Sequence, residues 1–296
     1  MKRVFRFAWR ALPFFVLAAV LLAVFLLPRG GQVRGEEVRI VRVWNVDTFE
    51  GGKGSRTSFL KRAALLAERE REGVRYLVTS VTQEGALAAL AEGEKPDVLS
   101  FGGGLSAFGA YALPLGESFA DGDRALPWCR GKYFLFSLTD DFSASGDTAI
   151  SVGGSNLSVA AAYFSEIRGT ETQSLTAYVD FLGGKYRYLL GTQRDRCRFA
   201  SRGAAVYEKE LPAYCDLYQY AAVLSEQSYD DALFFIDILR SETVQSMLSD
   251  IGMFPVAGAE GYTMEAFADE EHISAFVQAL RMGESVKFLR NFLKTV

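Results

Sequence analysis

The sequence predicts an α/β fold in which strands and helices alternate between residues 37 and 101. Three short β-branched, apolar runs are separated by two segments whose apolar residues recur at helical spacing. Glycine or proline ends each helical segment, as is usual before a following strand. Helices of this length between strands imply right-handed crossovers, so we expect a parallel sheet.

The composition is that of an ordinary globular protein. Hydrophobic residues make up 49% of the 296 residues and charged residues 23%, which excludes a disordered or fibrous chain. A chain of this length forms one large domain or two domains of medium size.

The N-terminus carries a candidate membrane segment. Four basic residues within the first ten precede an uncharged apolar run at 11–27, which has about the shortest length that spans a bilayer. The run ends in Pro-Arg-Gly-Gly at 28–31 and lacks an Ala-x-Ala-like cleavage site. We therefore favour an uncleaved anchor over a cleaved signal peptide or a core helix. The basic flank stays cytoplasmic, which places the chain beyond residue 35 on the extracellular or periplasmic face.

The exported part of the chain is acidic. Beyond Arg29 the chain holds 27 basic and 36 acidic residues, a net charge of about −9. A nucleic-acid partner is therefore not expected, because such partners are bound by basic surfaces.

The sequence has few residues that could bind a metal or act in acid–base catalysis. His272 is the only histidine and no Cys-x-x-Cys pair occurs, so we expect no zinc site, no histidine-based catalysis and no cofactor. The cysteines, Cys129, Cys197 and Cys215, permit at most one disulfide. Cys197 and Cys215 are the nearest pair in sequence, and buried free thiols are the alternative.

Five elements are expected in order after the N-terminal segment. Ser55 or Thr57 caps the first helix and Gly73 ends it, while Pro96 prevents the second helix from continuing. The first apolar run suits a strand that is covered on both faces. The expected elements are a strand at 37–46, a helix at 57–73, a strand at 74–81, a helix at 82–93 and a strand at 97–101.

Two of these strands lead into segments that suit a ligand. Ligands of open α/β sheets lie at the carboxyl ends of strands; the first strand leads into residues 44–52 and the third into glycines 102–104. Gly102 and Gly103 let backbone amides approach a ligand, and a sharp strand exit without a ligand is the alternative. The ligand candidates in the first segment are Trp44, Asn45, Asp47, Phe49 and Glu50.

Residues 91–98 resemble a family signature. They match the Ala-x-Gly-x-x-Pro-Asp-Val pattern that ends the helix before the third strand in extracellular solute-binding proteins of ABC importers. These proteins have the type II periplasmic-binding fold, and the resemblance is to the branch that includes sugar-binding members. It implies a two-lobe α/β protein with a ligand cleft between the lobes. The matching residues are Ala91, Gly93, Pro96, Asp97 and Val98.

A second signature follows far downstream. Residues 231–256 are similar to the family's helix pair, with an apolar face on the first helix, a glutamine in the second and a Gly-x-x-Pro exit. The residues concerned are Phe235, Ile238, Leu239, Gln245, Gly252 and Pro255. The chain departs from the family in its shorter second lobe and in lacking a cysteine near the apolar run to carry a lipid. An uncleaved helix would replace that lipid as the tether.

The segments between the signatures outline a hinge and a second lobe. Residues 125–138 look like the segment that crosses between the lobes, with Trp128 near the crossing, and 211–225 look like the returning strand, with Tyr218 close to the hinge.

The second lobe supplies further ligand candidates. A helix is expected at 155–169, with Asn156 or Ser155 suited to cap it. Arg194 and Asp195 follow a strand end within 186–199. They are either hydrogen-bonding groups of the cleft or an exposed turn pair of little energetic value.

The resemblance also implies domain boundaries. Residues 1–35 form the membrane segment, 36–127 with 224–262 the first lobe, and 128–223 with 263–296 the shortened second lobe.

We expect a binding protein and not an enzyme. Ser58 and Lys61 match the Ser-x-x-Lys of penicillin-recognising enzymes, but the Ser-Asp-Asn and Lys-Thr-Gly elements are missing. The expected ligand is a sugar or oligosaccharide, with Trp44 and Trp128 stacking on a ring and polar side chains accepting hydroxyl hydrogen bonds. Core packing of the aromatic rings is the alternative, as is a solvated loop for the acidic residues.

The expected partners are ABC permease subunits and, through the N-terminal helix, the membrane. Captured solute would be delivered to the permease. The alternative function is a membrane-anchored sensor or scaffold that keeps the binding-protein fold without transport delivery.

Overall fold

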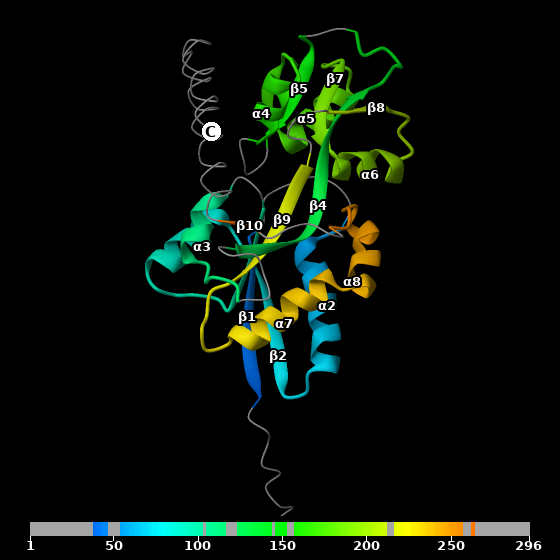
Figure 1. Cartoon of the computed structure of the whole chain (residues 1–296). Coiled ribbons are helices and arrows are strands. Elements are labelled where there is room, and N and C mark those ends of the chain that lie inside the picture. The colour runs from blue at the N-terminus through cyan, green and yellow to red at the C-terminus, as the bar shows by residue number, and fades with distance from the viewer. Residues whose placement is uncertain are drawn as a thin grey trace, which may run out of the picture. The chain divides into compact units, whose positions relative to one another are not determined.

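A ten-stranded sheet runs through the described part of the chain. The computed structural model describes residues 38–46, 54–102, 105–116, 123–143, 146–152, 157–211, 216–256 and 262–263. The chain divides into two compact units, Met1–Arg39 and Ile40–Val296. Apart from Arg39 at the start of the first strand, all the elements described below belong to the second unit. In spatial order the strands are β2 (Val74–Val81), β1 (Arg39–Val46), β3 (Val98–Gly102), β9 (Asp216–Val223), β4 (Asp123–Ser137), β7 (Tyr188–Thr192), β5 (Thr148–Val152) and β6 (Thr170–Gln173) (Figure 1). β8 (Tyr207–Glu210) and β10 (Tyr262–Thr263) also pair with β4.

The five elements expected after the N-terminal segment are confirmed. Ser55 caps the first helix by accepting a hydrogen bond from the Ser58 backbone N–H, and Thr82 caps the second through the Gly85 N–H. Gly73 ends the first helical segment with φ 75°, a left-handed conformation that glycine adopts at little steric cost. The elements are β1 (Arg39–Val46), α2 (Arg56–Glu70), β2 (Val74–Val81), α3 (Gln83–Ala91) and β3 (Val98–Gly102).

One long strand, β4 (Asp123–Ser137), joins two halves of the sheet. In the first half of the sheet, its first part pairs with β9 (Asp216–Val223), which pairs in turn with β3; β1 and β2 belong to the same half. Its last part pairs with β7 (Tyr188–Thr192) and β8 (Tyr207–Glu210). The predicted crossing segment and returning strand are therefore β4 and β9, respectively.

The remaining elements complete the second half and return to the first. In the second half they are β5 (Thr148–Val152), α4 (Leu157–Phe164), β6 (Thr170–Gln173), α5 (Ser174–Leu182) and α6 (Gln193–Ser201). The others are η1 (Ser106–Tyr111), α7 (Tyr229–Arg240), α8 (Glu242–Ser246), η2 (Leu248–Ile251) and β10 (Tyr262–Thr263).

The expectation of a parallel sheet is correct only in part. β1 runs parallel to β3, and β5 runs parallel to both β6 and β7. However, β9 is antiparallel to β3 and to β4, so the sheet is mixed. The reason is that β9 returns from the second half directly, whereas parallel neighbours need a long crossover connection.

Helices cover both faces of each half of the sheet (Figure 1). In β4, Phe134 and Phe136 pack in one apolar cluster with Phe181 of α5 and Phe199 of α6, whereas Tyr133 packs in the cluster of the opposite face. In the first half, α2 and α7 share one cluster, while α3 and η1 belong to another. This alternation follows from the two-residue period of a strand and identifies sheets buried on both faces.

Gln245 explains part of the second signature. Its side-chain Nε2 donates to the backbone oxygens of Trp128 and Leu239, both at 2.7 Å, and its Oε1 accepts from the Val256 N–H at 2.8 Å. Gly252 follows η2 with φ 66°. The glutamine thereby ties the helix pair to the crossing strand and to the segment after η2.

Several predictions fall on residues outside the described ranges. These include the membrane segment at 1–35; within the described ranges no helix has the length and apolarity needed to cross a membrane. Cys215 also lies outside, whereas Cys129 is buried and Cys197 is a half-buried free thiol. The domain boundaries of the two lobes stay a prediction.

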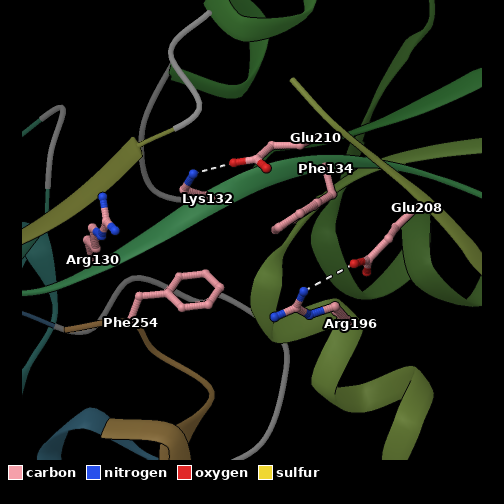
Figure 2. Close-up of a pocket in the computed structure, with 7 residues that line it drawn as sticks. All are labelled: Arg130, Lys132, Phe134, Arg196, Glu208, Glu210 and Phe254. Atoms are coloured by element: carbon pink, nitrogen blue, oxygen red, sulfur yellow. Dashed lines mark hydrogen bonds and ion pairs between the residues drawn. The ribbon is translucent and has the colours of Figure 1, made fainter. Parts of the chain in front are cut away.

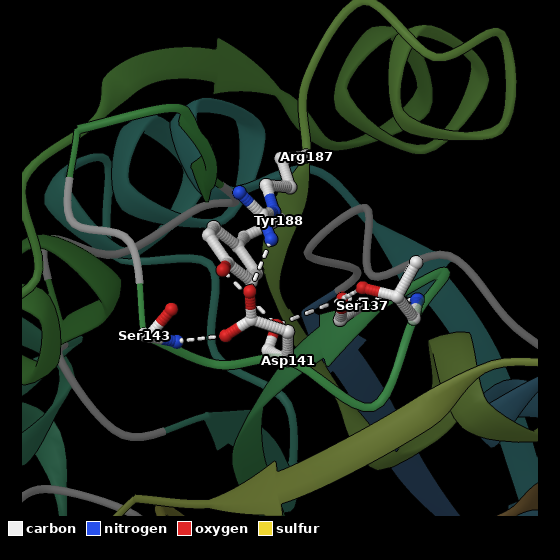
Figure 3. A network of polar contacts seen from close by, with 6 residues as sticks. Ser137, Asp141, Ser143, Arg187 and Tyr188 are labelled. Atoms are coloured by element: carbon white, nitrogen blue, oxygen red, sulfur yellow. Dashed lines mark hydrogen bonds and ion pairs between the residues drawn. The ribbon is translucent and has the colours of Figure 1, made fainter.

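A polar network holds the turn after β4. The Asp141 carboxylate accepts a hydrogen bond from the Ser143 N–H at 2.8 Å and pairs with the Arg187 guanidinium, while the Tyr188 hydroxyl donates to the Asp141 backbone oxygen at 3.0 Å (Figure 3). The hydrogen bonds from Ser143 and the nearby Arg187 charge lower the pKa of Asp141 below its usual 3.8. The charged form is therefore favoured by folding.

The Asp141 network predicts a pH-dependent loss of stability. Because the folded pKa lies below the unfolded one, the contribution is present above about pH 4 and is lost as pH falls through the folded pKa. Asp141→Asn should therefore lower the melting midpoint of the full-length chain in detergent at pH 7, with the difference shrinking towards pH 2. The exposed neighbour variant Asp140→Asn should leave the midpoint unchanged. An equal loss for Asp141→Asn at both pH values would contradict this assignment.

Candidate functional site

The first candidate site lies where β1 and β3 end. The two strands are parallel with Asn45 beside Ser100, so their carboxyl ends meet at one edge of the sheet. The segments that continue from them, 47–53 and 103–104, lie outside the described residues, as does 153–156 before α4. The roles predicted for Asp47, Phe49, Glu50, Gly103 and Asn156 therefore stay predictions.

Three of the predicted ligand residues are buried at this edge. Asn45 Nδ2 donates to Thr57 Oγ1 at 3.0 Å, its Oδ1 accepts from Ser100 Oγ at 3.1 Å, and Trp128 Nε1 donates to Ser100 Oγ at 3.1 Å. Trp128 is fully buried and stacks on the Phe59 ring, while Trp44 is 9% exposed within an apolar cluster. In this conformation the two indoles occupy the core, the alternative considered for them.

Gly102 lies against a glutamine that was not among the predicted ligand residues. Gly102 pairs with Gln219 of β9, and a Cβ at position 102 would lie 3.3 Å from Gln219 Oε1. That oxygen accepts a hydrogen bond from Arg56 Nη1 at 2.5 Å, whereas the buried Gln219 Nε2 has no hydrogen-bond partner among the residues that the structure describes. Tyr218, the neighbouring prediction, is half-buried and lies beside Tyr220.

The unused amide of Gln219 is energetically costly. A buried donor without an acceptor destabilises a protein by about 1–3 kcal/mol. Such a group at the carboxyl edge of a sheet is a candidate contact for a polar ligand. Gln219 lies within the predicted returning strand, but nothing local distinguished its side chain from that of other strand residues.

Arg194 and Asp195 are buried at the start of α6 and do not form an exposed turn. Asp195 Oδ2 accepts from the Thr192 N–H at 2.9 Å and the Thr192 side chain accepts from the Asp195 N–H, which together make a capping box. The Thr192 side chain also accepts from the Arg194 N–H. Arg194 Nη2 donates to the Gly54 backbone oxygen at 2.6 Å. This bond joins the second half to the residue before the α2 cap, Ser55.

A pocket of about 470 Å³ lies between β4, β8, α6 and the segment after η2 (Figure 2). Arg130, Lys132 and Phe134 alternate along β4 and line it from the sheet. Phe254 lines it from the first half and is held beside Arg130 by reciprocal backbone hydrogen bonds of 3.0 and 2.8 Å. The pocket is thus bounded by both halves.

Charged side chains of both signs face this pocket. Glu208 pairs with Arg196 at 3.1 Å, and Glu210 pairs with Lys132. Figure 2 shows the two ion pairs on either side of the Phe134 ring. No residue of this pocket was a predicted ligand residue, because acidic and basic side chains alternating along a strand are equally typical of a solvated face.

The Asn45 network can be tested by its stability. Asn45→Ala removes two hydrogen bonds inside the core, so the free energy of unfolding should fall by about 3 kcal/mol. Urea denaturation of the full-length chain in detergent, followed by tryptophan fluorescence, measures this loss. Thr79→Ala, on the exposed side of β2, should change it by less than about 0.5 kcal/mol. A loss from Asn45→Ala as small as that of Thr79→Ala would refute a core role.

No protein-family model matches the sequence, and no curated protein matches it either. Solved structures do match the fold. Iron-bound HitA from Pseudomonas aeruginosa matches with a TM-score of 0.59 and 14% identity, covering 81% of this chain and 99% of HitA. The cyclic alpha-maltosyl-1,6-maltose binding protein from Arthrobacter globiformis matches with a TM-score of 0.56 and 12% identity, covering 86% of this chain and 96% of that protein.

A third match is a two-component system protein described as mediating signal transduction. Its TM-score is 0.55 at 14% identity, and the match covers 73% of this chain and 86% of that protein. These likenesses extend over both halves of the sheet and over nearly the whole length of HitA. The chain therefore has the two-lobe α/β fold of the type II solute-binding proteins.

Proposed function

We propose that this chain is an extracellular solute-binding protein that captures a small solute and delivers it to the permease subunits of an ABC importer. The observation that carries the proposal is that two strands, β4 and β9, pass between the two halves of the sheet. The fold in which they do so covers 99% of HitA. Two lobes joined in this way can close on a ligand by hinge motion. Capture then involves no chemical change of the solute.

The ligand we propose is a sugar or oligosaccharide, bound at the carboxyl ends of β1 and β3. Its support is the likeness to a maltosyl-maltose binding protein and the buried, unpartnered amide of Gln219 beside Gly102. A sugar hydroxyl is an acceptor for such an amide. Asp47 and Glu50, in the segment after β1, are proposed to accept hydroxyl hydrogen bonds in return.

The N-terminal segment, residues 1–35, is proposed to anchor the protein as an uncleaved helix. An anchored chain also suits a second function, that of a sensor or scaffold that binds a solute without delivering it. The observation that favours it is the likeness to the two-component system protein. If the protein binds a solute but deleting its gene does not change uptake of that solute, the sensor function is favoured.

Ligand binding can be tested by thermal shift of the full-length chain in detergent. The panel should contain monosaccharides, oligosaccharides, amino acids and polyamines. A saccharide present at about 100 times its Kd should stabilise the fold by about 2.7 kcal/mol and raise the melting midpoint. A panel in which no compound moves the midpoint would contradict the binding function, and a shift confined to another class would contradict the saccharide.

Gln219→Glu separates the ligand role of this residue from its structural one. The change keeps an oxygen for Arg56 and removes the unpartnered Nε2 donor. Saccharide affinity should fall about fivefold, the value of one neutral hydrogen bond, while the midpoint without ligand should not fall. The exposed Gln227→Glu makes the same charge change and should alter neither quantity. Unchanged affinity in Gln219→Glu would remove this residue from the site.

A further inference from the structure

The pocket between β4, β8, α6 and Phe254 is separate from the residues proposed to bind the solute. Its β4 contribution comes from Arg130, Lys132 and Phe134, on the face that α6 covers. None of the residues that line it belongs to the strand-end site at Asn45, Gly102 and Gln219. Its volume of about 470 Å³ lies within the range of small-molecule sites.

The two ion pairs of this pocket can exchange their partners with a ligand. Lys132 is 24% exposed and Glu210 52%, while Arg196 is 39% and Glu208 37% exposed. Ion pairs at this exposure contribute little to stability, because water solvates the separated charges well. A ligand that offers a carboxylate to the cations and an ammonium group to the glutamates would therefore replace these pairs at little cost.

The guanidinium of Arg196 is set up to receive a planar anion. Its carbon lies 5.3 Å from the centre of the Phe134 ring and 5.6 Å from that of Phe254. Cation–π contacts with the two rings hold the charged group in place. The edge of the group carries its N–H donors, and a carboxylate accepts two of them in parallel.

The charges of the pocket select the ligand class. Three cationic side chains and two carboxylates line it, with a formal sum of +1. A simple anion would meet the two glutamates, and a simple cation would meet Arg130, Lys132 and Arg196. A molecule with both charges is complementary to both sets. The phenyl rings of Phe134 and Phe254 offer apolar surface to the carbon chain between those charges.

We propose that this pocket is a second binding site, for a small zwitterion of the amino-acid class. The carboxylate of the ligand pairs with Arg196, assisted by Arg130, and its ammonium group pairs with Glu208, which the ligand carboxylate displaces from Arg196. Because Phe254 belongs to the segment after η2 and Arg196 to α6, the bound ligand contacts both halves of the sheet. This site goes beyond the proposed capture of a saccharide at the strand ends.

The test is calorimetric titration of the full-length chain in detergent with matched probes. Leucine and 4-aminobutyrate are the zwitterions, 4-methylpentanoate lacks the amine of leucine, and leucinamide lacks its carboxylate. At least one zwitterion should bind. If leucine binds, removing either of its charges should weaken binding about tenfold or more, which is the effect of losing one charge-assisted hydrogen bond. No binding of either zwitterion, or equal binding of leucine and 4-methylpentanoate, would overturn the proposal.

Variants locate the site and separate it from the saccharide site. Glu208→Gln and Arg196→Gln should each weaken zwitterion binding about tenfold without lowering the melting midpoint, and the exposed Glu94→Gln should have no effect. The pocket variants should leave any saccharide shift intact, and Gln219→Glu should leave zwitterion binding intact. Loss of zwitterion binding in Gln219→Glu, with none in the pocket variants, would place that ligand at the strand ends and refute the pocket. A failed saccharide panel would not affect this result.

Discussion

The structure depends on the continuous hydrogen bonding of β4, which belongs to both halves of the sheet. Its first part pairs with β9 and its last part with β7 and β8. Without β4, strands of both halves would therefore lose a hydrogen-bonded neighbour. Pro127 lies within this central strand, where a proline removes a ladder hydrogen bond. The register shifts between Pro127 and Cys129, and a bulge of this kind accommodates the proline. The strand can therefore bend within the part that pairs with β9, before it passes into the second half at Tyr133.

Polar side chains buried beside β4 are matched to specific partners. Gln193 Oε1 accepts from the Lys132 N–H at 2.8 Å, and its amide lies so close to Gly131 that a Cβ there would approach to 2.5 Å. The half-buried Gln245 donates through Nε2 to the Trp128 backbone oxygen at 2.7 Å. Because an unpaired buried group costs about 1–3 kcal/mol, these contacts fix α6 and α8 against one strand. Gln219 Nε2 is the contrast, since it is as buried as Gln193 and has no acceptor in the described part of the chain.

The two proposed sites differ in their electrostatics. At the strand ends the contacts are buried hydrogen bonds, between Asn45, Thr57 and Ser100 and from the Arg56 guanidinium to Gln219, and they suit a ligand recognised by hydroxyl groups. In the pocket, exposed charges of both signs surround aromatic rings, as Arg196 does with Phe134 and Phe254. Buried neutral groups are costly to leave unpaired, whereas exposed ion pairs are readily exchanged. The first site therefore selects by geometry and the second by charge.

The sequence by itself determined the type and order of the elements from β1 to β3, because apolar period, caps such as Ser55 and stops such as Gly73 act within a few residues. It also located the crossing strand and, by resemblance, the fold. Only the tertiary structure decided that β9 is antiparallel to its neighbours, and that Asn45 and Trp128 are tied into the core through Ser100. The pocket could likewise not be predicted from the sequence, because Arg196 and Phe254 come from distant segments. These outcomes rest on contacts between residues far apart in the chain, which no local pattern encodes.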